Sequence, residues 1–149
     1  MIGLIQRVKQ AKVEVEDQVV GQIQQGILLL LGVEKHDSQA SAEKLCNKVL
    51  NYRIFVDQQD KMNLNIRQIS GELLVVSQFT LVADTQKGNR PGFSSGASPE
   101  LGAELYEHFI ACAKKTGLVC ETGKYGADMQ VSLVNDGPVT FWLETRQSV

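Results

Sequence analysis

The chain has few of the residues that build disulfide frameworks, zinc sites and hydrolytic triads, since its 149 residues include three cysteines and two histidines. Cys46, Cys112 and Cys120 are odd in number and widely spaced, and they form no C-x-x-C pair. A disulfide framework or a zinc site is therefore not indicated, and we expect buried free thiols. His36 falls in a polar turn and His108 within a predicted helix, which leaves a Ser-His-Asp or Cys-His arrangement poorly supported.

The sequence also lacks a membrane-spanning run, a signal peptide and an excess of basic charge. No apolar run approaches spanning length, and residues 1–16 lack the basic, apolar and small-residue order of a signal peptide. Lys and Arg number 15 against 17 Asp and Glu, a formal net charge of −2. Broad binding to nucleic acid needs clustered basic side chains, so any RNA contact should be local. We expect a cytoplasmic protein with no membrane partner.

Several catalytic motifs are absent. The chain contains no H-E-x-x-H, no Walker loop and no G-x-G-x-x-G, so zinc-peptidase, nucleotidase and dinucleotide-binding functions have no motif to support them. We expect no metal and no cofactor. With 43% hydrophobic and 21% charged residues, the composition is ordinary for a globular protein, and the length predicts a single domain over residues 1–149.

Apolar runs predict many short strands. The run ILLLLGV in residues 26–33 is continuous, which is typical of a strand buried on both faces. Residues 73–81 form the longest strand candidate, which is entered through Ser70 and Gly71. Further strands are predicted over residues 2–8, 11–16, 53–56, 119–121, 129–135 and 139–143.

Two helices are predicted between these strands. In residues 38–51 apolar side chains recur at the spacing of one helical face. Ser98 and Pro99 suit the N-cap and first position of a second helix, which is stopped by Gly117. Two helices and many strands together predict an α/β domain with a mixed sheet that is covered on one side.

A hydroxyl-rich segment ends the predicted strand 73–81. It contains Ser77, Gln78, Phe79 and Thr80, and a long polar loop, residues 82–97, follows it and is a functional candidate by its length. A threonine hydroxyl without a base is a poor nucleophile. Either another group activates Thr80, or main-chain N–H groups near Phe79 and Thr80 stabilise an oxyanion. The bare motif also fits a strand end with satisfied hydroxyls.

The segment NDGPVT, residues 135–140, interrupts two strand-like runs. Proline cannot donate to a sheet ladder, so Gly137 and Pro138 mark a break where main-chain carbonyls are left free. Free carbonyls can bind the ammonium group of a ligand.

The order of short segments along the chain resembles one known family from end to end. These segments are QRV, GVEK, YRIF, KMNLN, VVSQFTL, ADTQKGNRPGF and GADMQVSLVNDGPVTFW. Together they resemble the D-aminoacyl-tRNA deacylases. The resemblance implies that family's fold, a largely antiparallel and barrel-like mixed sheet. It also implies a homodimer that hydrolyses the ester of D-aminoacyl-tRNA, and of mischarged glycyl-tRNA, to release the free amino acid and tRNA in chiral proofreading.

The resemblance also implies roles for particular residues. A Gly-cis-Pro dipeptide, here Gly137-Pro138, enters the active site of the other subunit, where its carbonyls hold the substrate's α-amino group. Arg7 orients that loop; from the sequence alone, a strand-end salt bridge is an equal alternative. The scissile ester is surrounded by Ser77, Gln78, Phe79 and Thr80, and the adenosine pocket is lined by Tyr125 and Met129.

Three questions stay open at this point. Thr80 could act as nucleophile, or the ribose 2′-hydroxyl of the terminal adenosine could assist while Phe79 and Thr80 N–H groups hold the oxyanion. Where the family reads R-P-S-F, this chain has Gly92 in R-P-G-F, so a hydroxyl contact is missing and we expect a looser loop. A non-catalytic module that only binds the CCA end of tRNA is the alternative function.

Overall fold

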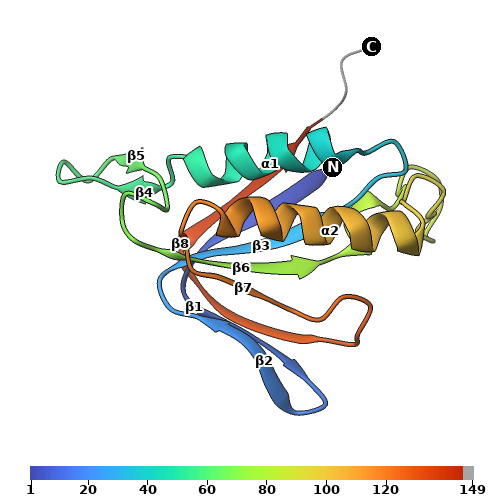
Figure 1. Ribbon diagram of the computed structural model, residues 1–149, viewed down its shortest axis with the longest axis horizontal. Coiled ribbons are helices and arrows are strands. Elements are labelled where there is room, and N and C mark those ends of the chain that lie inside the picture. The colour runs from blue at the N-terminus through green and yellow to red at the C-terminus, as the bar shows by residue number, and fades with distance from the viewer. Residues whose placement is uncertain (146–149) are drawn as a thin grey trace.

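The computed structural model describes residues 1–145 and confirms a mixed sheet with two main helices (Figure 1). The helices are α1 (Gln39–Asn51) and α2 (Pro99–Lys114), with a short 3-10 helix η1 (Phe79–Val82) between them. The strands are β1 (Ile2–Val15), β2 (Gln18–Ile23), β3 (Gly26–Gly32), β4 (Phe55–Val56), β5 (Met62–Leu64), β6 (Glu72–Ser77), β7 (Cys120–Thr122) and β8 (Gln130–Glu144).

The main sheet is almost closed on itself. Its strand order is β2-β1-β3-β6-β7, and β8 also pairs with β1. Strand β3 runs parallel to β6, and β6 to β7, whereas β1 is antiparallel to β2, β3 and β8. At the closure β2 lies against β7, where a Cβ on Gly21 would collide with the carbonyl of Thr122. The expected barrel-like, largely antiparallel sheet is thus confirmed.

Both faces of the central strands are buried, which explains the continuous apolar run of β3. Helices α1 and α2 lie side by side over one face, as expected (Figure 1). The core beneath them includes Ile5, Ile27, Leu29, Leu45, Val75, Leu105 and Phe109. The core on the opposite face, inside the curled sheet, contains Val8, Ala11, Val13, Ile23, Leu28, Leu74 and Val76.

Several predicted boundaries are wrong. The strands expected at 2–8 and 11–16 are one strand of 14 residues, β1, because its pairing with β8 continues from Ile2 to Glu14 across two register shifts. The strand expected at 73–81 ends at Ser77, and the chain then turns into η1. Strands β2 and β5 were not predicted. Their pairing with neighbours, rather than their own apolar pattern, makes them strands.

Helix α2 begins as its sequence predicts. The Oγ of Ser98 accepts a hydrogen bond of 3.2 Å from the N–H of Leu101, and Pro99 occupies the first turn. This cap fixes the start of α2 next to the end of β6, where the candidate site lies. No helix among residues 1–145 combines the length and apolar character that a membrane crossing needs.

The loop at residues 82–97 is tied to the body of the protein by main-chain pairing. The N–H of Lys35 donates to the carbonyl of Ser95 over 3.0 Å. Glu34 forms an isolated antiparallel β-bridge with Gly96. Within the loop, Gly92 and Asp84 exchange two hydrogen bonds of 2.7 and 2.9 Å. These main-chain bonds fasten the loop at Gly92 without a side-chain hydroxyl, and the expectation of a looser loop stays a prediction.

Candidate active site

A cavity of ≈ 500 Å³ opens where β6 ends. Its walls come from the end of β6, from η1, from the first turns of α2 and from the segment before β8. Of the residues singled out in the sequence, the structure brings together here Ser77, Gln78, Phe79, Tyr125 and Met129. Segments about fifty positions apart in sequence therefore form one pocket.

Aromatic rings frame this cavity. Phe79 is 69% exposed, and its ring centroid lies 5.3 Å from that of Phe93. Tyr106 and Tyr125, which also line the cavity, have ring centroids 5.6 Å apart. Flat apolar surfaces of this kind suit a planar ring such as a nucleobase.

The two tyrosine hydroxyls are anchored to backbone carbonyls. Tyr106 donates to the carbonyl of Val75 over 3.1 Å, and Tyr125 donates to the carbonyl of Pro99 over 3.3 Å. Burial raises the pKa of Tyr106 to about 12, and burial followed by the charge of Glu100 raises the pKa of Tyr125. Both hydroxyls are therefore protonated near neutral pH and act as fixed donors.

The cavity contains little that could serve as a general base. Among the described residues that line it, the only charged side chain is that of Asp128, which is exposed. His108 is bonded to Glu43 between the helices, and His36 is exposed in the turn before α1; neither lines the cavity. The described residues that line the cavity therefore include no evident base that could activate a hydroxyl.

Thr80 differs from its neighbours in the motif. It is exposed and does not line the cavity. The side-chain amide of Gln78 donates a hydrogen bond to Thr80 Oγ1, which fixes the orientation of that hydroxyl. The structure therefore gives Thr80 a polar partner, but no group that could remove its proton.

The backbone at the same point presents N–H groups. Phe79 and Thr80 are the first residues of η1, and the first N–H groups of a helix have no acceptor within the helix. The N-cap, Gln78, makes no side-chain capping bond to them. These N–H groups are therefore suited to bind a negatively charged oxygen beside the cavity.

The Gly137-Pro138 segment forms an excursion within β8. Gln6 pairs with Thr140 and Val8 with Asn135, so residues 136–139 lie opposite Arg7 alone. The expected chain break is present as this bulge, although β8 continues on both sides. The Gly137-Pro138 peptide bond is cis, which confirms the geometry that the resemblance implied.

Side chains at the base of this loop hold it in place. Asn135 Oδ1 accepts from the N–H of Val139 over 2.7 Å, and its amide donates to Thr140 Oγ1 over 3.0 Å. Gly137 has φ of +142°, and a Cβ there would lie 2.7 Å from a methyl of Val139. Both Gly137 and Pro138 are exposed. Asn135 belongs to the motif identified in the sequence, but its role in holding the loop was not predicted.

Arg7 fastens the loop to the rest of the fold. Its Nε donates to the carbonyl of Asp136 over 2.9 Å, and its Nη1 donates to the carbonyl of Ile54 over 2.7 Å. Its Nε also lies 3.7 Å from the carboxylate of Asp136. The loop contact and the salt bridge considered from the sequence are therefore both present.

The loop lies far from the cavity of its own chain. Arg7 pairs with Ile27, and Ile27 pairs with Leu73. Ser77, at the cavity, is four residues further along β6, or about 13 Å at the usual rise per residue. Neither Gly137 nor Pro138 lines the cavity. The structure thus separates two groups of residues that the resemblance assigns to one active site.

Some lining residues were not found from the sequence. Phe93, Tyr106 and Asp128 line the cavity. Phe93 lies in the loop that was flagged by its length, whereas Tyr106 looks like an ordinary core position of α2. Only its hydroxyl, which needs a partner when buried, could have drawn attention to it.

Solved structures give the class of the protein. One, titled "c-Myc DNA Unwinding Element Binding Protein", has a TM-score of 0.93 and 38% identity and covers 99% of this chain and 100% of that chain. Another, titled "Structural Analysis of a probable eukaryotic D-amino acid tRNA deacylase", has a TM-score of 0.82 and covers 97% of this chain and 98% of that chain. At 16% identity the second shows a shared fold alone. The fold class is that of the D-aminoacyl-tRNA deacylases.

Sequence relatives then give the particular family. The model described as D-Tyr-tRNA(Tyr) deacylase matches residues 4–144. A D-aminoacyl-tRNA deacylase of Pseudoalteromonas atlantica is 66% identical over 143 residues, and one of Haemophilus influenzae is 66% identical over 144 residues. Both matches cover 96% of this chain and 99% of the relative. The chain belongs to the D-Tyr-tRNA(Tyr) deacylase family, and it is an ester hydrolase rather than a non-catalytic binding module.

Replacing Arg7 with Gln should loosen the loop. The variant loses charge-assisted bonds to two buried or half-buried carbonyls, and such bonds contribute about 1.5–3 kcal/mol each at most. We expect a lower free energy of unfolding in urea and a lower deacylation rate. Lys9→Gln, on an exposed position of the same strand, is the matched control. Equal unfolding midpoints for the two variants would show that Arg7 does not hold the loop.

Proposed function

We propose that this enzyme hydrolyses D-aminoacyl-tRNA and reads the chirality of its substrate with Gly137-Pro138 of a second subunit. One observation carries the proposal. The loop is firmly held and exposed, yet it lies outside the cavity of its own chain. A loop that cannot reach its own cavity is free to enter another subunit's cavity.

The exposed side of β8 supports a homodimer. Among the described strands β8 pairs only with β1, so its other edge is open. Large apolar side chains on β8 are exposed to solvent, including Val134, Phe141 and Trp142 at 44%, 36% and 48%. Exposed apolar surface next to an open strand edge is typical of an interface between subunits.

The cavity suits the 3′-terminal aminoacyl-adenosine of tRNA. Tyr125 and Met129, which line the cavity, would contact the adenosine, and Phe79 with Phe93 offers a second apolar surface. The ester carbonyl would lie beside η1, where the N–H groups of Phe79 and Thr80 stabilise the developing oxyanion. The ribose 2′-hydroxyl then assists the attack of water, since the cavity offers no strong base.

The proposed selection of D over L substrates follows from fixing the α-amino group of the substrate against the main chain. If the carbonyls of Gly137 and Pro138 hold the α-ammonium group, an L side chain points into the main chain and a D side chain points away. Main-chain atoms read the position of the Cβ and not the identity of the side chain. The enzyme should therefore accept several D-amino acids and also glycine, which has no Cβ.

The first test compares substrates. Initial deacylation rates on D-Tyr, D-Asp, Gly and L-Ala esters of tRNA are measured at equal concentration with catalytic amounts of enzyme. We expect D-Tyr, D-Asp and Gly esters to be cleaved and the L-Ala ester to be slower by at least about 100-fold, because its Cβ meets backbone. Equal rates on L-Ala and D-Tyr esters would refute the chiral filter, and preference for one D-amino acid would indicate a side-chain pocket.

A second test asks whether each site is shared. Gly137→Ala damages the loop, and Ala97→Trp fills the cavity, so each variant alone should be inactive. After random exchange of subunits, half of the dimers are mixed, and each has one site with an intact loop and an intact cavity. We expect recovery of about a quarter of wild-type activity. Activity that stays at the level of the parent variants, in a sample shown by mass spectrometry to contain mixed dimers, would place loop and cavity in one chain.

Thr80→Ala separates the two chemical routes. If the 2′-hydroxyl assists, this variant keeps most of its single-turnover rate, while a 2′-deoxyribose substrate reacts about 100-fold more slowly or worse with wild-type enzyme. If Thr80 is the nucleophile, Thr80→Ala loses nearly all activity and the deoxy substrate is still cleaved by the wild type. Thr85→Ala, in the adjacent loop, is the control for loss of an exposed threonine hydroxyl.

A further inference from the structure

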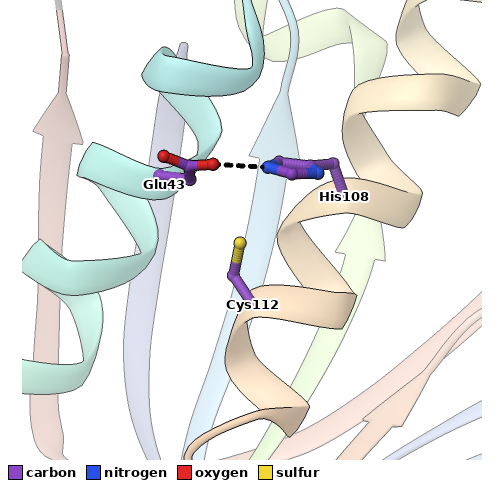
Figure 2. Close-up of side chains that lie close together, drawn as sticks. All are labelled: Glu43, His108 and Cys112. Carbon is purple, nitrogen blue, oxygen red and sulfur yellow. Dashed lines mark hydrogen bonds and ion pairs between the residues drawn. The ribbon is translucent and has the colours of Figure 1, made fainter.

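A second group of reactive side chains lies between the two helices, apart from the cavity. Glu43 projects from α1, and His108 and Cys112 project from α2 (Figure 2). The two α2 residues are four positions apart, so they lie on one face of that helix, one turn from each other. Figure 2 shows the Glu43 carboxylate pointing at the imidazole and the Cys112 thiol pointing toward the pair.

The distances are close to those of a metal site. His108 Nε2 lies 2.9 Å from Glu43 Oε1, and the three ligand atoms all lie within 4.8 Å of one another. Around a tetrahedral Zn²⁺, with bonds of about 2.0–2.3 Å, neighbouring ligand atoms are roughly 3.3–3.6 Å apart. The widest separation would therefore need to close by at most about 1.2 Å, and the pair of His108 and Glu43 would need to open by roughly 0.4 Å.

The surroundings allow an ion to enter. The side chains of Glu43 and His108 are 56% and 24% exposed. Cys112 is half-buried, whereas Cys46 and Cys120 are buried at 2% and 7% exposure. Cys112 is thus the thiol that a dissolved ion can reach. A neutral imidazole, a carboxylate and a thiolate together would balance the charge of a divalent cation.

We propose that Glu43, His108 and Cys112 bind one Zn²⁺ ion, with water as the fourth ligand. Mixed nitrogen, oxygen and sulfur donors suit this ion. Binding displaces the proton of the Cys112 thiol into solvent, and the metal takes the place of the hydrogen bond between His108 and Glu43. Widely spaced cysteines gave no sign of such a site in the sequence, because its ligands come from two separate helices.

The position of the site suggests what the ion does. Helix α2 contributes Pro99, Gly102 and Tyr106 to the cavity wall, and Tyr106 is two residues before His108. A metal bridge fastens α2 to α1 and so stiffens one wall of the cavity. The ion lies outside the cavity and takes no part in the ester chemistry. This inference does not depend on the proposed substrate.

The test uses the full chain, reduced and freed of metal. Calorimetric titration with Zn²⁺ should show one ion per chain, and Co²⁺ should give a thiolate charge-transfer absorption band. His108→Gln and Cys112→Ser should each weaken Zn²⁺ binding by at least about tenfold, and Cys112→Ser should abolish the band. His36→Gln, which changes the other histidine, should bind as the wild type does. Zn²⁺ should also raise the melting temperature of wild type but not of His108→Gln.

Three results would overturn the proposal. They are an absence of Zn²⁺ binding by wild type, binding that His108→Gln and Cys112→Ser leave unchanged, and a Co²⁺ band that survives in Cys112→Ser. Melting curves without metal show whether each variant is folded. If His108→Gln does not fold, Cys112→Ser, which is nearly isosteric, decides the question by itself.

Discussion

The parallel pairing of β3 with β6 is the constraint on which the rest of the structure depends. Two parallel neighbours need a long crossover, and here α1 and the β4–β5 hairpin supply it. Because both faces of this pair must be covered, the helices occupy one face and the curled ends of β1, β2 and β8 enclose the other. The central pair therefore sets the positions of the helices, of the curled strands and of the cavity at the end of β6.

The same pairing separates the two motifs of the active site. It brings Ser77 to the end of the sheet where α2 begins, and it leaves Arg7 and the Gly137 loop near the opposite end of β3. Within one chain the proposed selector and the proposed reaction site are therefore incomplete. Association of two chains through the exposed side of β8 offers a physical way to reunite them.

The proposed mechanism depends on the placement of dipoles rather than on a strong base. The cavity has N–H groups at the start of η1 and mostly apolar walls, and its two tyrosine hydroxyls are held by backbone carbonyls. In such surroundings, oriented donors stabilise an oxyanion more strongly than they would in water. Helix α2 forms a wall of this cavity and also carries two of the three proposed metal ligands, so its packing on α1 affects both places.

The sequence by itself determined the local features: the continuous apolar run of β3, the Ser98-Pro99 start of α2, and the two motifs at residues 77–80 and 137–138. Each depends on side chains close together along the chain, where periodicity, capping and proline chemistry act. Tertiary structure alone decided that β1 is one strand, that β2 is a strand, and that Tyr106 lines the cavity. It also decided that Glu43 meets His108 and Cys112. These features depend on pairing and packing between distant segments, whose contacts leave no periodic signal in the sequence.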